Sequence, residues 1–140
     1  MPLVLNRFEV ADYLDEVFPQ VRGDFEIDDL QDMAVTMRLK VCDRHLRPGG
    51  TVSGPSMFSL ADCAVYVMVL GMLGRRALTV TTNCSIDFMR KPKAGADLIA
   101  HGTLLKLGKL LAVGDVHLKS DGADDLVARA TLTYAIPPDR

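Results

Sequence analysis

A single carboxylate interrupts the most hydrophobic stretch of the sequence. Residues 54–73 read GPSMFSLADCAVYVMVLGML, and Asp62 lies near the middle of this run. A lone buried carboxylate costs free energy unless something compensates its charge. Asp62 is therefore either chemical or structural. In the structural case it would be hydrogen-bonded at an interface or paired with a cation such as Arg47.

Other reactive side chains give weaker signals. Cys63 adjoins Asp62, but no histidine has a sequence context that would place it beside Cys63 for a Cys–His mechanism. The cysteines form no CxxC pair, and neither they nor the histidines show metal-ligand spacing. These residues are Cys42, Cys63, Cys84, His45, His101 and His117. We expect reduced, structural thiols, as in a cytoplasmic protein, and no metal site.

Length and charge narrow the class of protein. The 140 residues predict a single domain, 1–140, and the net charge of −2 gives no basic footprint for nucleic acid. No secretory signal is apparent at the start. The apolar run is nearly long enough to span a bilayer, but Asp62, Ser56 and Ser59 argue against a membrane segment. A soluble cytoplasmic protein is expected.

The elements that must position Asp62 follow from periodicity and from turn residues. A helix-start signature at Asn6 and Glu9 predicts a short N-terminal helix that ends near Pro19. Ser53 is the simplest N-cap for the apolar helix, and Pro55 suits its first turn. A Gly/Pro-rich loop precedes that helix. Strands are predicted over 25–30, 35–41, 77–89, 97–107, 110–119 and 126–136.

A helix that is apolar on nearly every face must be covered on nearly every face. The predicted cover is a strongly curved antiparallel sheet of about six strands wrapped around the long central helix. The fold class is therefore α+β. Because the far side of the helix also stays apolar, we expect a second subunit.

The sequence also resembles a known family. SGPSMFSLADCA, residues 53–64, is similar to the HGGxxxxLADxA signature of hot-dog-fold acyl-CoA thioesterases of the phenylacetate-degradation type, related to 4-hydroxybenzoyl-CoA thioesterase. The resemblance continues through TVTTNCSIDFMRKPKAGADLIAHGTLLKLGKLLAVGDVHL and LVARATLTY. It covers roughly residues 25–136. It implies the hot-dog fold and the hydrolysis of an acyl-CoA thioester to a free acid and coenzyme A.

The resemblance also implies roles for individual residues. Asp62 would be the general base or nucleophile, and the Gly54 N–H would polarise the thioester carbonyl at a helix N-terminus. Thr81 would anchor the water or the carboxylate. The site would be built between two subunits of a dimer, or of a tetramer made from two dimers. No metal or redox cofactor is implied, and coenzyme A enters only as part of the substrate.

Three positions depart from the family pattern. Ser53 replaces the family's histidine, Arg47 replaces its usual asparagine, and Pro55 replaces the second glycine and has no N–H to donate. Ser53 could replace the histidine's hydrogen bond, although its reach is shorter. Arg47 could pair with Asp62 or hold the substrate.

Basic residues that follow one strand, and others that flank a hairpin, would meet the nucleotide end of coenzyme A, as the resemblance implies. Lysines hold phosphates as point charges, and glycine permits close backbone approach. The candidates are Arg90, Lys91, Lys106, Gly108 and Lys109. The alternative is that these residues form ordinary solvated turns.

Other functions remain open at this point. The chain could bind acyl-CoA without hydrolysing it, because the oxyanion site has fewer hydrogen-bond donors than the family pattern provides. A hot-dog dehydratase would need a histidine paired with the acid, and Ser53 removes the obvious candidate. A purely structural dimer would explain the apolar helix but not the spacing between the Gly loop and Asp62.

Overall fold

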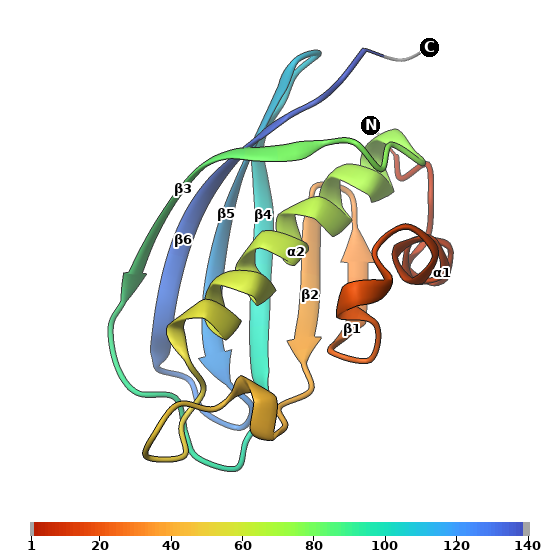
Figure 1. Cartoon of the computed structure of the whole chain (residues 1–140). Helices are drawn as coiled ribbons and strands as arrows, with labels where there is room; N and C mark the ends of the chain where they lie inside the picture. The colour runs from red at the N-terminus through yellow and green to blue at the C-terminus, as the bar shows by residue number, and fades with distance from the viewer. Residues whose placement is uncertain (1, 139–140) are drawn as a thin grey trace.

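The structure is a computed structural model that describes residues 2–138. A curved sheet wraps around one long helix, and a short helix packs beside the first strand (Figure 1). The helices are α1 Arg7–Val17 and α2 Gly54–Leu73, with short 3-10 turns at Pro19–Val21 and Asp43–His45. The strands are β1 Phe25–Gln31, β2 Ala34–Leu39, β3 Val80–Phe88, β4 Leu98–Leu107, β5 Leu111–Ser120 and β6 Leu126–Ala135.

The sheet is antiparallel throughout, with strand order β1-β2-β4-β5-β6-β3. Register shifts interrupt four of its five ladders. Bulges bend strands and increase their twist, which lets the sheet curl around α2. The expected α+β arrangement of six strands around a long apolar helix is confirmed.

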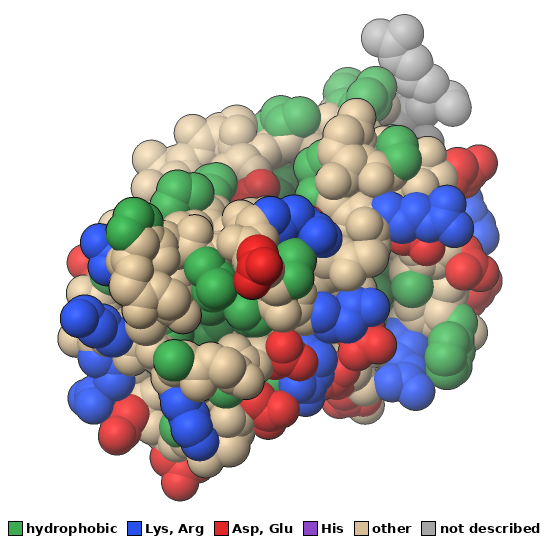
Figure 2. Space-filling model, turned by 60° about the horizontal axis from the view of Figure 1, so that its bottom comes forward, with side chains coloured by type: hydrophobic (Ala, Val, Ile, Leu, Met, Phe, Trp, Pro, Cys, Tyr) green, Lys and Arg blue, Asp and Glu red, His purple; other side chains and the backbone are tan. Residues whose placement is uncertain are grey.

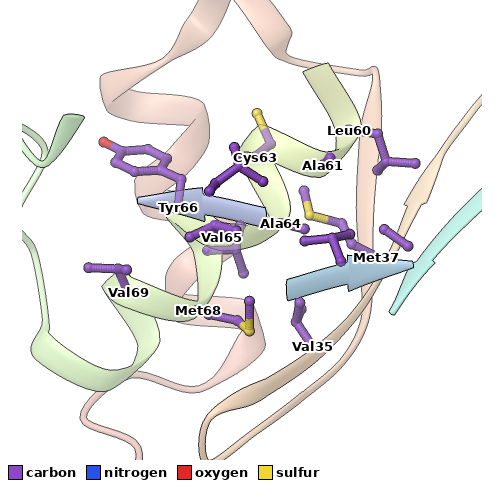
Figure 3. Close-up of a cluster of buried hydrophobic side chains, with 14 of the residues drawn as sticks. Val35, Met37, Leu60, Ala61, Cys63, Ala64, Val65, Tyr66, Met68 and Val69 are labelled. Atoms are coloured by element: carbon purple, nitrogen blue, oxygen red, sulfur yellow. The ribbon is translucent and has the colours of Figure 1, made fainter. Parts of the chain in front are cut away.

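Helix α2 begins where local chemistry predicts. Ser53 is the N-cap, and its hydroxyl accepts a hydrogen bond from the Ser56 N–H at 3.3 Å. The helix ends at Gly74, whose φ of 98° is a conformation that favours glycine. By length and composition α2 could cross a membrane, but most of it is buried inside the protein, as in a core helix. Figure 3 shows its side chains leaving around the circumference of the helix.

Small residues on the concave face of the sheet let α2 lie close to it. Gly102, Gly114 and four buried alanines of β4, β5 and β6 point toward the helix side. A Cβ added at Gly114 would lie 2.7 Å from Val65 Cγ2, so the helix backbone approaches closely only because this side chain is missing. The distance between α2 and the sheet, and therefore the burial of Asp62, depends on these small residues.

The short helix α1 has the predicted cap. The Asn6 side chain accepts from the Glu9 N–H at 2.9 Å, and the Glu9 carboxylate accepts from the Asn6 N–H at 3.1 Å. One element differs from expectation: β3 begins at Val80 rather than at residue 77. The Ala77 carbonyl accepts instead from the Tyr66 hydroxyl at 2.8 Å, which ties residues 77–79 into a turn against α2.

Candidate active site

Asp62 lies on α2 at a partly exposed position, and two hydroxyls donate hydrogen bonds to one of its oxygens. The Thr81 Oγ1 is 2.5 Å from Asp62 Oδ1, and the Tyr134 Oη is 2.8 Å from the same atom. Oη is also 2.9 Å from the backbone carbonyl of Asp62. Among the described residues the carboxylate has no cation paired with it, but it is not left without partners. Two neutral donors compensate its charge.

A bulge in β3 brings Thr81 to this position. Thr81 pairs with Tyr134 across the ladder, whereas Asn83 pairs with Thr133, so Thr82 is an extra residue. Beyond the bulge, Cys84 and Ile86 face the core side. With strict alternation from Cys84, Thr81 would point the other way. The irregularity therefore aims the threonine hydroxyl at α2.

A pocket of about 380 Å³ opens beside the carboxylate. Apart from Asp62, Thr81 and Tyr134, its wall is mainly apolar and includes Val17, Phe18, Cys63, Tyr66 and Val80. The Tyr66 and Tyr134 rings are stacked with centroids 6.2 Å apart. Such a wall suits an apolar acyl group next to a single charged side chain.

Thr79 lines the same pocket and is 4% exposed, yet its hydroxyl has no hydrogen-bond partner among the described residues. A buried hydroxyl without a partner costs about 1–3 kcal/mol. Thr79 therefore lowers stability at the wall of the candidate site.

Electrostatics around Asp62 keep its neighbours protonated. Burial, and then the Asp62 charge, raise the pKa of the Tyr134 hydroxyl well above its ordinary value. The same two causes raise the pKa of the Cys63 thiol to about 12 and also raise the pKa of Cys84. Cys63 is therefore a neutral thiol and not a nucleophilic thiolate.

A second pocket, of about 310 Å³, lies at the N-terminus of α2. Its wall contains Gly54 together with three predicted binding residues, Arg47, Arg90 and Lys91. The Phe88 ring lies against Gly54, where an added Cβ would be 3.4 Å from the ring. Figure 2, which brings the bottom of Figure 1 forward, shows hydrophobic side chains in a hollow with Lys and Arg side chains beside it.

The predicted catalytic residues are divided between these two pockets. Gly54 and Asp62 are eight positions apart on one helix, or about 12 Å along its axis. Thr81 joins Asp62, whereas Ser53 stays with Gly54, and its hydroxyl donates to Ser56 Oγ at 3.1 Å. One chain therefore does not place the Gly54 N–H next to its own Asp62.

The remaining predicted binding residues lie elsewhere. Lys106, Gly108 and Lys109 belong to the β4–β5 hairpin, at the top of Figure 1, while the loop that follows β3 is at the bottom. The Gly108 N–H donates to the Leu111 carbonyl at 2.8 Å and closes this turn. The hairpin and the Arg90 loop are at opposite ends of the sheet.

Sequence reasoning missed Tyr134 and Thr79. Tyr134 follows Ala128, Ala130 and Leu132 at alternate positions on the buried face of β6. A tyrosine on an inward face needs a partner for its hydroxyl, and Asp62 was the one carboxylate predicted inside the core. That signal could have paired the two residues. Nothing in the sequence marks Thr79.

The group available for chemistry here is a carboxylate that is hydrogen-bonded by two hydroxyls and lies beside a mainly apolar pocket. Among the described residues, no group of three or more His, Cys, Asp or Glu side chains is arranged to hold a metal ion. His101 and His117 pair across β4 and β5 on the exposed face and stay outside both pockets.

Comparisons with known proteins identify the family and support the fold. A family described as the thioesterase superfamily matches residues 49–134. Human acyl-coenzyme A thioesterase 13 is 28% identical over 116 residues, which cover 83% of this chain and 82% of the relative. A protein from Silicibacter sp. TM1040, solved as a candidate thioesterase, is 60% identical with a TM-score of 0.92 and covers 97% of this chain and 94% of its own.

A more distant structure, a hypothetical thioesterase protein with coenzyme A from Streptococcus pneumoniae, has a TM-score of 0.77 at 23% identity. It covers 92% of this chain and 97% of its own, and it supports the fold.

Proposed function

The chain belongs to the thioesterase superfamily, and from that premise we propose that it hydrolyses an acyl-CoA thioester to a free acid and coenzyme A. One observation carries the proposal: the Asp62 carboxylate accepts hydrogen bonds from two hydroxyls at the wall of a pocket lined largely by apolar side chains. The apolar part suits the acyl group, and the carboxylate suits attack at the thioester carbonyl.

Two routes use the same carboxylate. As a general base, Asp62 takes a proton from water as the water oxygen bonds to the carbonyl carbon. As a nucleophile, it bonds to that carbon itself, and water then hydrolyses the acyl-enzyme anhydride. In both routes the carbon–sulfur bond breaks, and the sulfur leaves and takes up a proton. Water is the co-reactant, so the proposed reaction needs neither a metal nor a redox cofactor.

The oxyanion donor is proposed to come from a second chain. The Gly54 N–H is at the first position of α2, where it can stabilise negative charge, but in its own chain it lies about two turns from Asp62. Two features support pairing of copies along β3: this strand is at the edge of the sheet, and Val80, Phe88 and Met89 are exposed on or beside it. We propose a dimer, or a tetramer of two dimers, with Asp62 of one chain facing Gly54 of the other.

The coenzyme A end would lie at the N-terminus of α2. Arg47, Arg90 and Lys91 surround the pocket there, and cations together with a helix N-terminus attract phosphate groups. The presence of coenzyme A in the Streptococcus pneumoniae relative agrees with this class of ligand. Lys106, Gly108 and Lys109 lie at the opposite end of the sheet in the same chain. They could therefore contact a ligand in this pocket only if another chain supplied them.

A second candidate is binding of acyl-CoA without turnover. It is favoured by the N-terminus of α2, where the Ser53 hydroxyl is engaged with Ser56 and Pro55 lacks an N–H. In this case thioesters would bind but stay intact. The protein's place in the cytoplasm is part of the proposal in either form and agrees with its three free cysteines.

Steady-state hydrolysis of a panel of acyl-CoA thioesters, with release of free thiol as the readout, tests the proposal. Asp62→Asn should lower kcat by at least about 100-fold, because it removes the base or nucleophile. Asp115→Asn, on the strand face that points away from α2, is the matched control and should keep the wild-type rate. Binding of intact thioesters without hydrolysis would instead establish the second candidate.

Mixing two inactive variants tests the shared site. Gly54→Pro removes the N–H at a helix position that accepts proline, and Ser53, with φ −74° and ψ 155°, already has the conformation required before proline. Losing one oxyanion donor costs about 10²–10³ in kcat. Co-expressed Asp62→Asn and Gly54→Pro chains should regain about a quarter of the wild-type rate, because half the dimers are mixed and each has one intact site. No recovery would contradict the two-chain site.

A further inference from the structure

We propose that Tyr134 is a positioning residue: together with Thr81 it clamps Oδ1 of Asp62 and leaves Oδ2 as the oxygen that reacts. The proposal rests on the function proposed above and assigns the two carboxylate oxygens different tasks.

The clamp is built across the β3–β6 ladder. Thr81 and Tyr134 are directly opposite each other in register, so their hydroxyls approach the carboxylate from neighbouring strands. Both hydroxyls donate to Oδ1, at 2.5 Å and 2.8 Å. A carboxylate oxygen has about two lone-pair sites, so two donors fill those of Oδ1.

Oδ2 is in a different situation. None of the hydrogen bonds among the described residues involves it, and it is not one of the buried polar atoms that lack a partner. It therefore reaches the surface of the pocket that Asp62 lines. Its lone pairs are the ones free to accept a proton from water or to attack a carbonyl carbon.

Tyr134 also restricts the orientation of the Asp62 side chain. Its Oη lies within hydrogen-bond distance of both the carboxylate and the backbone carbonyl of Asp62, at 2.8 Å and 2.9 Å, so its single proton is shared between the side chain and the backbone of the same residue. Burial and the Asp62 charge keep the phenol protonated, which maintains it as a donor. Stacking on Tyr66 fixes the plane of the ring. Thr81 alone could not hold the carboxylate in this way, because a single bond leaves rotation about the bond axis.

Positioning acts on the chemical step and not on ground-state binding. Tyr134→Phe keeps the ring and removes one oxygen atom. We expect kcat to fall by about 10- to 100-fold while KM stays within about threefold of the wild-type value. Loss of structure alone would lower the amount of active protein, and with it the apparent kcat at an unchanged KM. kcat is therefore expressed per folded, titrated site, which removes that contribution.

Tyr66→Phe is the matched comparison. It removes the hydroxyl of the neighbouring stacked ring, whose hydrogen bond goes to the Ala77 carbonyl and not to Asp62. We expect the fall in kcat for Tyr134→Phe to exceed that for Tyr66→Phe by at least about tenfold. Thr81→Val and Thr81→Ser give an independent pair, since serine keeps the donor: valine should lower kcat and serine should largely restore it.

Four enzymes measured on one substrate separate the possible failures. If the wild-type protein hydrolyses the thioester and Asp62→Asn does not, yet Tyr134→Phe matches Tyr66→Phe, the clamp is overturned and the proposed function stands. A parallel rise of KM with unchanged kcat would also overturn it, since Tyr134 would then be a binding residue. Absence of turnover by the wild-type protein would overturn the proposed function and the clamp together.

Discussion

Gly114→Ala should destabilise the protein, although glycine-to-alanine changes in a strand usually help. Removing the flexibility of glycine from the unfolded chain stabilises by about 0.5–1 kcal/mol. Here the added Cβ would lie 2.7 Å from Val65 Cγ2 and 3.1 Å from Cγ1, closer than van der Waals contact allows. Val65 is fully buried and β-branched, so it has no other rotamer to adopt in the helix.

The helix must therefore move away from the sheet. Overpacking of this kind costs about 1–3 kcal/mol, and subtracting the entropic gain leaves a net loss of up to about 2.5 kcal/mol. Asp62 is one turn before Val65 on the same helix, so its hydrogen bonds to Thr81 and Tyr134 should lengthen as well. We expect kcat to fall with stability.

Urea unfolding followed by circular dichroism measures the change, because the chain has no tryptophan. Protein concentration must be the same for all variants, since self-association alters apparent stability. Gly102→Ala is a useful comparison: the added Cβ would lie 2.9 Å from the flexible end of Met68 and 3.0 Å from Val35 Cγ1, so only the second contact resists, and the cost should be smaller.

Val65→Ala in combination tests the cause. Alone it should cost about 2 kcal/mol, from two buried methyl groups and the space they leave. Combined with Gly114→Ala, the new methyl occupies that space at 3.5 Å from the remaining Cβ, and the double variant should be more stable than Val65→Ala. Additive losses, or a Gly114→Ala protein as stable as the wild type, would refute the reasoning.

Three further outcomes are expected. Thr79→Val should raise the free energy of unfolding by about 1 kcal/mol in urea titrations, because it removes an unpartnered buried hydroxyl. In native protein at pH 8, a thiol reagent should modify the exposed Cys42 well before Cys63, whose pKa is raised to about 12; equal rates would contradict this burial. Arg38 donates a hydrogen bond to Asp121 at 2.8 Å and lowers the pKa of that carboxyl below 3.8. The stabilisation that this pair contributes is therefore present above pH 3.8 and is lost as the pH falls further. Arg38→Gln should flatten that part of an acid-unfolding curve.

The sequence predicted most of the architecture because its signals are local. The Asn6–Glu9 capping box and the Ser53 cap lie where expected, and alternation, side-chain composition and turn residues together located all six strands. The exception was the start of β3. Residues 77–79 were included in the strand because they lead into the Thr- and Val-rich segment, but the Tyr66 hydroxyl donates to the Ala77 carbonyl from another element, and these residues form a turn.

The candidate site was predicted only in part, for the same reason. Asp62 and Thr81 were named from a linear motif, and they are in contact. That contact depends on an extra residue in the β3–β6 ladder, and the sequence TTN carries no mark of a bulge. Tyr134 is 72 positions from Asp62, and only the closing of the sheet around α2 brings the two together.

The sequence by itself therefore determined the elements, the apolar character of α2 and the presence of one carboxylate within it, since these depend on side-chain type and short-range spacing. Tertiary structure alone decided which oxygen of Asp62 accepts the two hydrogen bonds, that the Thr79 hydroxyl has no partner within residues 2–138, and that Gly54 and Asp62 line separate pockets. The physical reason is that hydrogen bonds and close packing depend on positions in space to within a fraction of an ångström. Those positions are set by strand register and by small residues such as Gly114 beneath the helix.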